Sequence, residues 1–152
     1  MNHKEHEEHK ERKDEHKEEE RKREHYEPLA PEVEAAVRDV IGAGIAVHSA
    51  LGPGFMEVVY DRALLIELRH RGRRAERQKA IEIGYRGELV CRHRLDLIVE
   101  GVVVVEVKAV KKLRPIHQAQ LLSYLKASGC RVGLLMNFNV RRFVNGLQRF
   151  VR

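Results

Sequence analysis

The chain has 152 residues, enough for one ordinary domain with its own hydrophobic core. The first 27 residues hold eight Lys or Arg and eleven Asp or Glu, a net charge of −3, whereas the whole chain carries +6. Residues 28–152 therefore carry +9, which favours a polyanionic partner.

The two cysteines form neither a disulfide framework nor a CxxC metal motif. No apolar run approaches the ~20 residues that span a membrane, and the N-terminus lacks a hydrophobic signal region, so we expect a cytoplasmic protein without membrane association.

The N-terminal segment, residues 1–27, is a low-complexity run of Glu, Lys, Arg and His. It has almost no apolar side chains to bury, so we expect a disordered tail or a transient helix in solvent. A metal-binding tail is one alternative, because five histidines lie in this segment: His3, His6, His9, His16 and His25. No cysteine or fixed turn organises these histidines, which favours a solvated tail. Residues 28–152 are expected to form a single domain.

The elements predicted after the tail begin with two helices. A helix runs from Pro31 to about His48, LGPG at 51–54 forms a turn, and a second helix covers residues 55–71. Three strands follow, within residues 78–86, 89–99 and 102–110. A third helix starts at Pro115 and ends at Gly129, and a buried strand covers 132–138 before a basic, amphipathic end at 140–152. This order predicts a mixed α/β sheet with helices packed on it.

Three charged residues on two of these strands suggest a site. Glu106 and Lys108 share one face of their strand, and Asp96 joins that face only if the loop between the strands has an odd length. A three-residue loop, a type I turn closed by a left-handed glycine, pairs Ile98 with Val102 and leaves Asp96 diagonally across from Glu106, roughly 7 Å away. Two carboxylates at that distance favour a cation, and oxygen ligands suit Mg²⁺ or Mn²⁺. Lys108 would orient or deprotonate a water and offset charge on a phosphate.

Each part of this pattern also has an ordinary structural interpretation. Glu106 and Lys108 fit a charged pair at the edge of a sheet. Glu57 fits a first-turn carboxylate that the helix dipole favours, with Tyr60 three residues further on. Tyr124, four residues after Gln120 on one helical face, fits the edge of an amphipathic core.

Taken together, the motifs resemble a known family. GFMEVVY at 54–60 resembles the signature of the GxxExxY protein family, and VHSALGPGF before it and LLMNFNV near the end are similar to that family as well. The resemblance covers roughly residues 36–151. The family is placed in the PD-(D/E)XK nuclease superfamily, which implies a restriction-endonuclease-like α/β core of helix, three strands, helix and strand.

The resemblance also implies roles for individual residues. Asp96 and Glu106 are implied as metal ligands, with Glu106-Val107-Lys108 as the (D/E)XK element and Glu57 as the acid that completes the metal site. QLLSY at 120–124 resembles the QxxxY motif of the RecB-like branch, so that Lys108, Gln120 and Tyr124 are implied as catalytic residues. Leu95 stands where the superfamily name has a proline.

Basic side chains offer a surface for a phosphodiester backbone. Arg92 and Arg94 share the strand parity of Asp96, and we assign them, with Tyr60, to substrate binding. Further basic residues extend this surface: Lys111, Lys112, Arg114, Arg141 and Arg142. His48 has no chemical role that follows from its position, and we expect it to pack between elements.

The leading hypothesis is a Mg²⁺- or Mn²⁺-dependent nuclease that hydrolyses phosphodiester bonds, with DNA as the leading substrate. A homodimer would let such a protein address two strands. The alternative is a non-catalytic module on a nuclease-like fold that binds nucleic acid or another partner. The joint presence of Asp96, Glu106 and Lys108 favours the enzyme, whereas DNA binding without any dependence on divalent metal would favour the module.

Overall fold

The computed structural model describes residues 27–152, and the predicted tail with its histidines, residues 1–26, lies outside the described residues. The elements, in chain order, are α2 (Pro31–Leu51), α3 (Glu57–His70), β1 (Ala75–Tyr85), β2 (Glu88–Val99), β3 (Val103–Lys108), α4 (Pro115–Ser128), β4 (Val132–Asn137), the 3₁₀ helix η1 (Phe143–Gly146) and β5 (Leu147–Val151). Within this part of the chain, no helix is long and apolar enough to cross a membrane.

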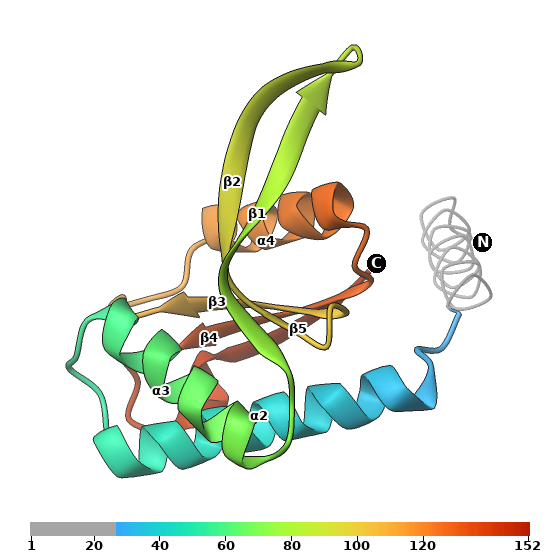
Figure 1. Cartoon of the computed structure of the whole chain (residues 1–152). Helices are drawn as coiled ribbons and strands as arrows, with labels where there is room; N and C mark the ends of the chain where they lie inside the picture. Colours follow the sequence, from blue (N-terminus) through green and yellow to red (C-terminus); the bar gives the residue numbers. More distant parts are fainter. Residues whose placement is uncertain (1–26) are drawn as a thin grey trace, which may run out of the picture.

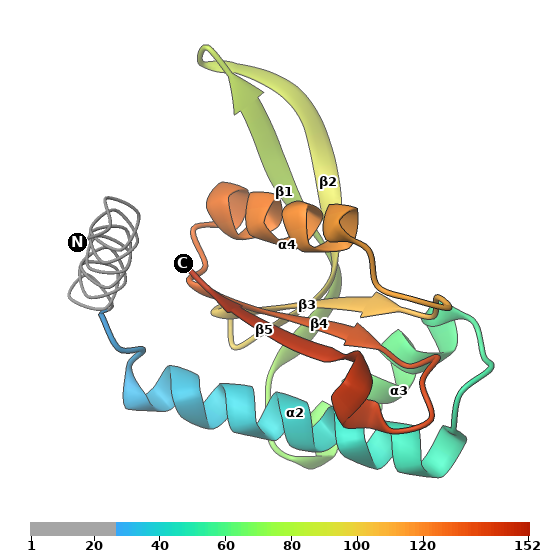
Figure 2. The same ribbon diagram turned by 180° about the vertical axis from the view of Figure 1, so that it is seen from behind.

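The five strands form one mixed sheet in the order β1-β2-β3-β4-β5. All neighbours are antiparallel except β3 and β4, which are parallel and are joined by α4 as a crossover helix. Figures 1 and 2 show α2 and α3 on one face of the sheet and α4 on the other. This arrangement confirms the predicted mixed α/β sheet and is consistent with a restriction-endonuclease-like fold.

The core has two sides because helices cover both faces of the sheet. Val103, Val105 and Val107 of β3 belong to the cluster under α2 and α3, whereas Val104 packs towards Leu121 of α4. A strand that is buried on both faces needs apolar residues at consecutive positions, which explains the run of valines in β3. A charged residue on this strand is therefore placed inside the molecule.

The C-terminal segment differs from the prediction of an amphipathic end. Residues 147–151 form β5, which pairs antiparallel with β4, and η1 precedes it. The ring of Phe143 in η1 fills the space where a Cβ atom at Gly44 of α2 would lie. His48 is buried beside it, and its Nε2 lies 2.8 Å from the carbonyl oxygen of Val140, so the prediction of a packing histidine is confirmed.

The long β1–β2 hairpin is twisted sharply where it leaves the rest of the sheet, and it projects past α4 (Figure 1). Leu97 belongs to the core under α2 and α3, but Leu95, two residues earlier, belongs to the core under α4. Opposite the intervening Asp96, Gln78 of β1 has a φ of 55°, a left-handed conformation that is uncommon without glycine. At the kink, Gln78 and Asp96, the face of the hairpin that packs on the core changes, and the pairing of β2 with β3 ends.

Candidate metal centre

The loop between β2 and β3 has the odd length that the acidic pair requires. Three residues separate Val99 and Val103, which are the last paired residues of the two strands. The predicted pairing of Ile98 with Val102 is wrong, however, because Ile98 lies opposite Val104. The register is therefore shifted by two residues on β3.

The shifted register brings the two acids closer than predicted. Continued by one residue beyond the pair Leu97–Val105, it places Asp96 directly opposite Glu106 and not diagonally across from it. The strands separate at this point, and Oδ2 of Asp96 accepts the backbone N–H of Val107 at 2.8 Å. The side chain of Asp96 thus takes the place of a strand partner, which fixes its carboxylate beside β3.

Glu106 is the buried member of the pair, with 6% of its surface exposed. Burial first, and then the negative charge of Asp96, raise the pKa of its carboxyl group to about 8, and the nearby Lys108 ammonium opposes this rise. Among the described residues, Oε1 of Glu106 is buried without a hydrogen-bond partner. Such an oxygen is costly unless something binds it, and a cation between the two carboxylates would relieve both the burial and the repulsion.

Lys108 is half-buried and lies two residues after Glu106 on the same face of β3. This strand is central, with β2 on one side and β4 on the other. The interpretation of Glu106 and Lys108 as a charged pair at a sheet edge is therefore wrong. Lys108 instead places its own positively charged ammonium group beside the acidic pair.

Helix α4 contributes an aromatic side chain from above the pair. Burial raises the pKa of the Tyr124 hydroxyl, and the charges of Glu106 and Asp96 add to the effect, which places this hydroxyl in their field. The ring of Tyr124 stacks on His93 of β2 with 4.0 Å between ring centroids. Gln120 lies one turn earlier on α4 and is half-buried.

Glu57 lies across an open cleft from Asp96. It is exposed at the start of α3, and its Oε1 accepts the N–H of Ala109 at 3.4 Å. The cleft, of about 790 Å³, is lined by both Glu57 and Asp96. Within residues 27–152, no three acidic, His or Cys side chains are close enough together to hold one metal ion. Asp96 and Glu106 alone fit Mg²⁺, which keeps several waters and is commonly bound through one or two carboxylates.

Tyr60 does not lie in the cleft, so the assignment of this residue to direct substrate contact does not agree with the structure. It is fully buried, and its ring stacks on Phe138 with 4.5 Å between centroids. Its hydroxyl donates to the carbonyl of Gly52 at 2.6 Å and accepts the N–H of Phe55 at 3.1 Å. Tyr60 therefore fixes the turn that precedes Glu57.

The expected substrate-binding arginines lie on the projecting hairpin. Arg92 is exposed and bonds Glu82 of β1 at 3.2 Å, and Arg94 is exposed opposite Ala80. Arg141 and Arg142 are exposed between β4 and η1. A pocket of about 640 Å³ lies just after Lys108, lined by Val110, Lys111, Lys112, Arg114 and His117. The residues expected to bind phosphates thus lie in three places: on the β1–β2 hairpin, in the segment before η1, and in the pocket after Lys108.

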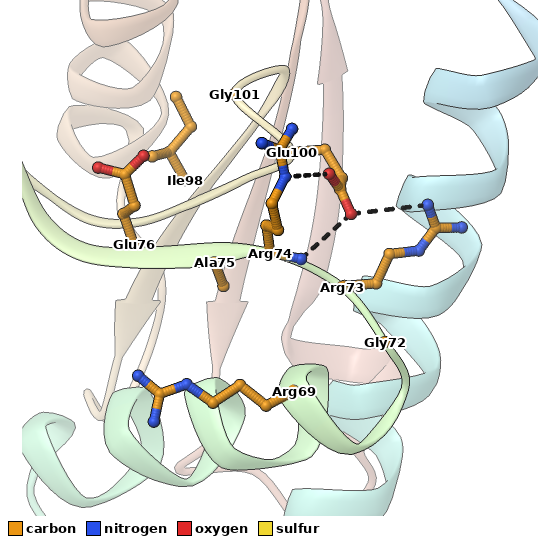
Figure 3. A pocket seen from close by; sticks show the side chains of 9 residues that line it. All are labelled: Arg69, Gly72, Arg73, Arg74, Ala75, Glu76, Ile98, Glu100 and Gly101. Carbon is orange, nitrogen blue, oxygen red and sulfur yellow. Dashed lines mark hydrogen bonds and ion pairs between the residues drawn. The ribbon is translucent and has the colours of Figure 1, made fainter.

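Another basic pocket, of about 480 Å³, lies at the opposite end of β3 (Figure 3). There the carboxylate of Glu100 accepts two hydrogen bonds from Arg74, one from the backbone N–H at 3.1 Å and one from the side-chain Nε at 3.2 Å. Nη1 of Arg73 lies 3.9 Å from Oε1 of Glu100. The hydrogen bonds from Arg74 hold the pKa of Glu100 below its ordinary value, and the bond from the Arg74 backbone has the largest effect. The turn also differs from the predicted type I, because Glu100 (φ 53°) and Gly101 (φ 70°) are both left-handed. Two of the three arginines that line this pocket hold the fold together, Arg74 through Glu100 and Arg73 through a bond of 2.7 Å to Asp39.

Sequence reasoning missed three features that shape the site, two contacts and one backbone kink. They are the bond from Val107 to Asp96, the stacking of His93 on Tyr124, and the kink at Gln78. His93 gave a weak signal, since it lies three residues before Asp96 in a strand that was already suspected. The other two features depend on backbone positions that no residue type marks.

One of three comparisons with known proteins found a match. A family model described as the PD-(D/E)XK nuclease superfamily matches residues 34–150, which span every element from α2 to β5. Searches of curated proteins and of solved structures found no match. Members of the superfamily are usually nucleases and generally use divalent metals such as Mg²⁺. The chain belongs to the PD-(D/E)XK nuclease superfamily.

Proposed function

We propose that this protein is a metal-dependent nuclease that hydrolyses phosphodiester bonds in DNA. The observation that carries the proposal is the buried oxygen of Glu106, which has no hydrogen-bond partner among residues 27–152 and lies beside the carboxylate of Asp96. A protein keeps such an unfavourable pair where it serves a function. Asp96 and Glu106 would hold Mg²⁺ or Mn²⁺, and Glu57, which lines the same cleft as Asp96, would bind one of the waters that such an ion keeps.

The side chains around the acidic pair suit hydrolysis of a phosphodiester. A bound divalent ion would neutralise charge on the phosphate and lower the pKa of a water. Lys108 would donate hydrogen bonds to the phosphate or orient the attacking water, and its charge would offset the negative charge that develops. Gln120 and Tyr124 would act as further catalytic residues that α4 contributes to the site, as the resemblance of QLLSY to the QxxxY motif implies.

The charge of the folded part supports a nucleic acid as the substrate. Residues 28–152 carry +9, and the pocket after Lys108 places Lys111, Lys112 and Arg114 beside the proposed centre. Arg92 and Arg94, on the β1–β2 hairpin, would contact the phosphate backbone of the DNA further from the proposed centre. Contacts of this kind supply affinity for phosphates without reading the sequence.

The first test is cleavage of single-stranded, duplex and branched DNA with Mg²⁺ or Mn²⁺. We expect metal-dependent cleavage by the wild type and a loss of at least about a hundredfold in Lys108→Ala and in Asp96→Ala. Lys126→Ala is the matched control, because this lysine is exposed at the far end of α4. It should cleave like the wild type.

The alternative function, a binding module without turnover, gives a different result in the same experiment. The wild type would then bind DNA equally well with and without divalent metal and would leave every substrate intact. That outcome would contradict the nuclease proposal.

A further inference from the structure

Two open pockets meet at the carboxyl end of β3. Ala109 lines the cleft of about 790 Å³ that also contains Asp96 and Glu57, and the next residue, Val110, lines the basic pocket of about 640 Å³. The chain that follows Lys108 therefore runs between the two pockets. Their linings differ in chemistry, and the difference indicates which part of a nucleotide each pocket can take.

The basic pocket suits phosphates. Its lining contains Lys111, Lys112, Arg114 and His117 and includes no acidic side chain. The two lysines and Arg114 are exposed, and no ion pair within residues 27–152 neutralises them. A neighbouring stretch of phosphate backbone would supply the missing negative charge.

The cleft, in contrast, has an apolar wall. Phe55, Met56 and Val58 are exposed by 49%, 73% and 37%, a group of large apolar side chains on the rim of a polar site. The ring of Phe55 makes an edge contact with buried Tyr60, with centroids 6.2 Å apart, and its backbone N–H is bonded to the Tyr60 hydroxyl. Phe55 is thus anchored on one side while about half of its surface stays open.

The opposite wall of the cleft offers no cation that is free to bind a phosphate. Its guanidinium, Arg77, donates to buried Asp61 through two bonds of 2.9 and 3.0 Å. Beside it lies Gln78, a half-buried residue whose left-handed backbone is rare for a residue other than glycine. The carboxylates of Glu57 and Asp96 in this cleft suit a metal ion and repel a phosphate, whereas the exposed ring of Phe55 and the neutral amide of Gln78 suit an uncharged, flat group.

We propose that this cleft binds one unstacked nucleobase, with Phe55 as its stacking partner. The backbone of the same strand would cross the acidic pair and continue into the basic pocket. The preferred substrate class is then DNA with an unpaired nucleotide at the cleavage position, such as a single strand or a frayed end. In a paired duplex the base must first leave the stack, which costs free energy. This inference rests on the proposed nuclease function.

The experiment measures binding of the full chain to a labelled 20-nucleotide strand, alone and annealed to its complement, by fluorescence anisotropy. Ca²⁺ replaces Mg²⁺, and a gel checks that the strand stays intact. We expect Phe55→Ala to lower the affinity for the single strand roughly tenfold and to leave the duplex affinity nearly unchanged. Phe55→Tyr should restore binding. Tyr85→Ala is the matched control, because Tyr85 is an exposed aromatic residue at the hairpin tip, outside the cleft.

A second arm tests whether a base is bound at all. A strand of the same length that carries no bases should bind the wild type roughly tenfold more weakly than the normal strand, and Phe55→Ala should lose no further affinity on it. Phe55→Leu keeps an apolar contact with Tyr60 and should show the same loss as Phe55→Ala, which separates stacking from a fault in folding. Equal losses for single strand and duplex, or equal binding of the wild type to the strands with and without bases, would overturn this inference alone. No binding of any DNA by the wild type would overturn the nuclease proposal as well.

Discussion

Two glutamates at the two ends of β3 have opposite environments. Glu100, in the loop before the strand, accepts two hydrogen bonds from Arg74, and its pKa is lowered. Glu106, near the end of the strand, has a buried oxygen without a partner among the described residues, and its pKa is raised to about 8. The same side chain thus fixes a turn at one end of β3 and leaves a binding capacity unused at the other.

The comparison separates acids that stabilise the fold from acids that cost it stability. Burial of a carboxylate beside another carboxylate is unfavourable, and an apolar residue would suit the inside of a central strand better. A natural protein tolerates such a cost where activity depends on it. The contrast between Glu100 and Glu106 therefore predicts opposite results for the same substitution.

The largest expected effect is on cleavage. Glu106→Gln removes a proposed metal ligand, and we expect the rate to fall about a thousandfold, since metal-assisted stabilisation of the transition state is worth several kcal/mol. Glu100→Gln should leave the rate nearly unchanged and lower the free energy of unfolding by less than about 1 kcal/mol. Rates measured on one DNA substrate with Mg²⁺ compare the two. Similar losses in both variants would break the distinction between the two glutamates.

The next effect is on the pH dependence of stability without metal. The folded-state pKa of Glu106, about 8, lies above its ordinary value of 4.5, so the folded protein binds more protons between these values. The free energy of unfolding should therefore fall as pH rises from about 4.5 to 8, by an amount on the order of 4 kcal/mol. Glu106→Gln should remove this loss, whereas Glu100→Gln should keep it. Urea unfolding in EDTA at pH 5 and pH 8.5 measures this change in the free energy of unfolding. An equal change in the wild type and in both variants would contradict the raised pKa of Glu106.

The smallest of these effects is stabilisation by the metal. At pH 8, Mn²⁺ at 100 times its Kd should raise the free energy of unfolding of the wild type by about 2.7 kcal/mol, a rise in Tm of roughly 10 °C. Glu100→Gln should respond like the wild type. Glu106→Gln and Asp96→Asn should respond weakly or not at all, and a full response in either would show that the ion binds elsewhere, such as on the histidines of residues 1–26.

Local chemistry made most of the fold predictable. Pro31 and Pro115 stand in the first turns of α2 and α4, and Gly129 ends α4 in a left-handed conformation, as expected for a helix cap. The strand β5 was missed because the apolar residues of 140–152 recur at spacings that also fit a helix. Pairing with β4, which is contributed by a distant part of the fold, decides in favour of a strand.

The candidate site was predictable in its residues but not in its register. Strand parity and an odd loop were enough to place Asp96 and Glu106 on one face. The turn that sets the register depends on Glu100, which Arg74, 26 positions earlier, holds in place, and a local pattern carries no information about that contact. Tyr60 was misassigned for a similar reason, because its stacking partner, Phe138, lies far along the sequence.

The kink at Gln78 has a consequence for the molecule in crowded solution. β1 is an edge strand, and an edge with an unbroken row of backbone N–H and C=O groups is a template on which a second molecule can add a strand. The left-handed residue interrupts that row, and charged Glu76 and Lys79 lie on either side of it. The backbone distortion that turns Gln78 towards the cleft therefore also protects the sheet against edge-to-edge aggregation.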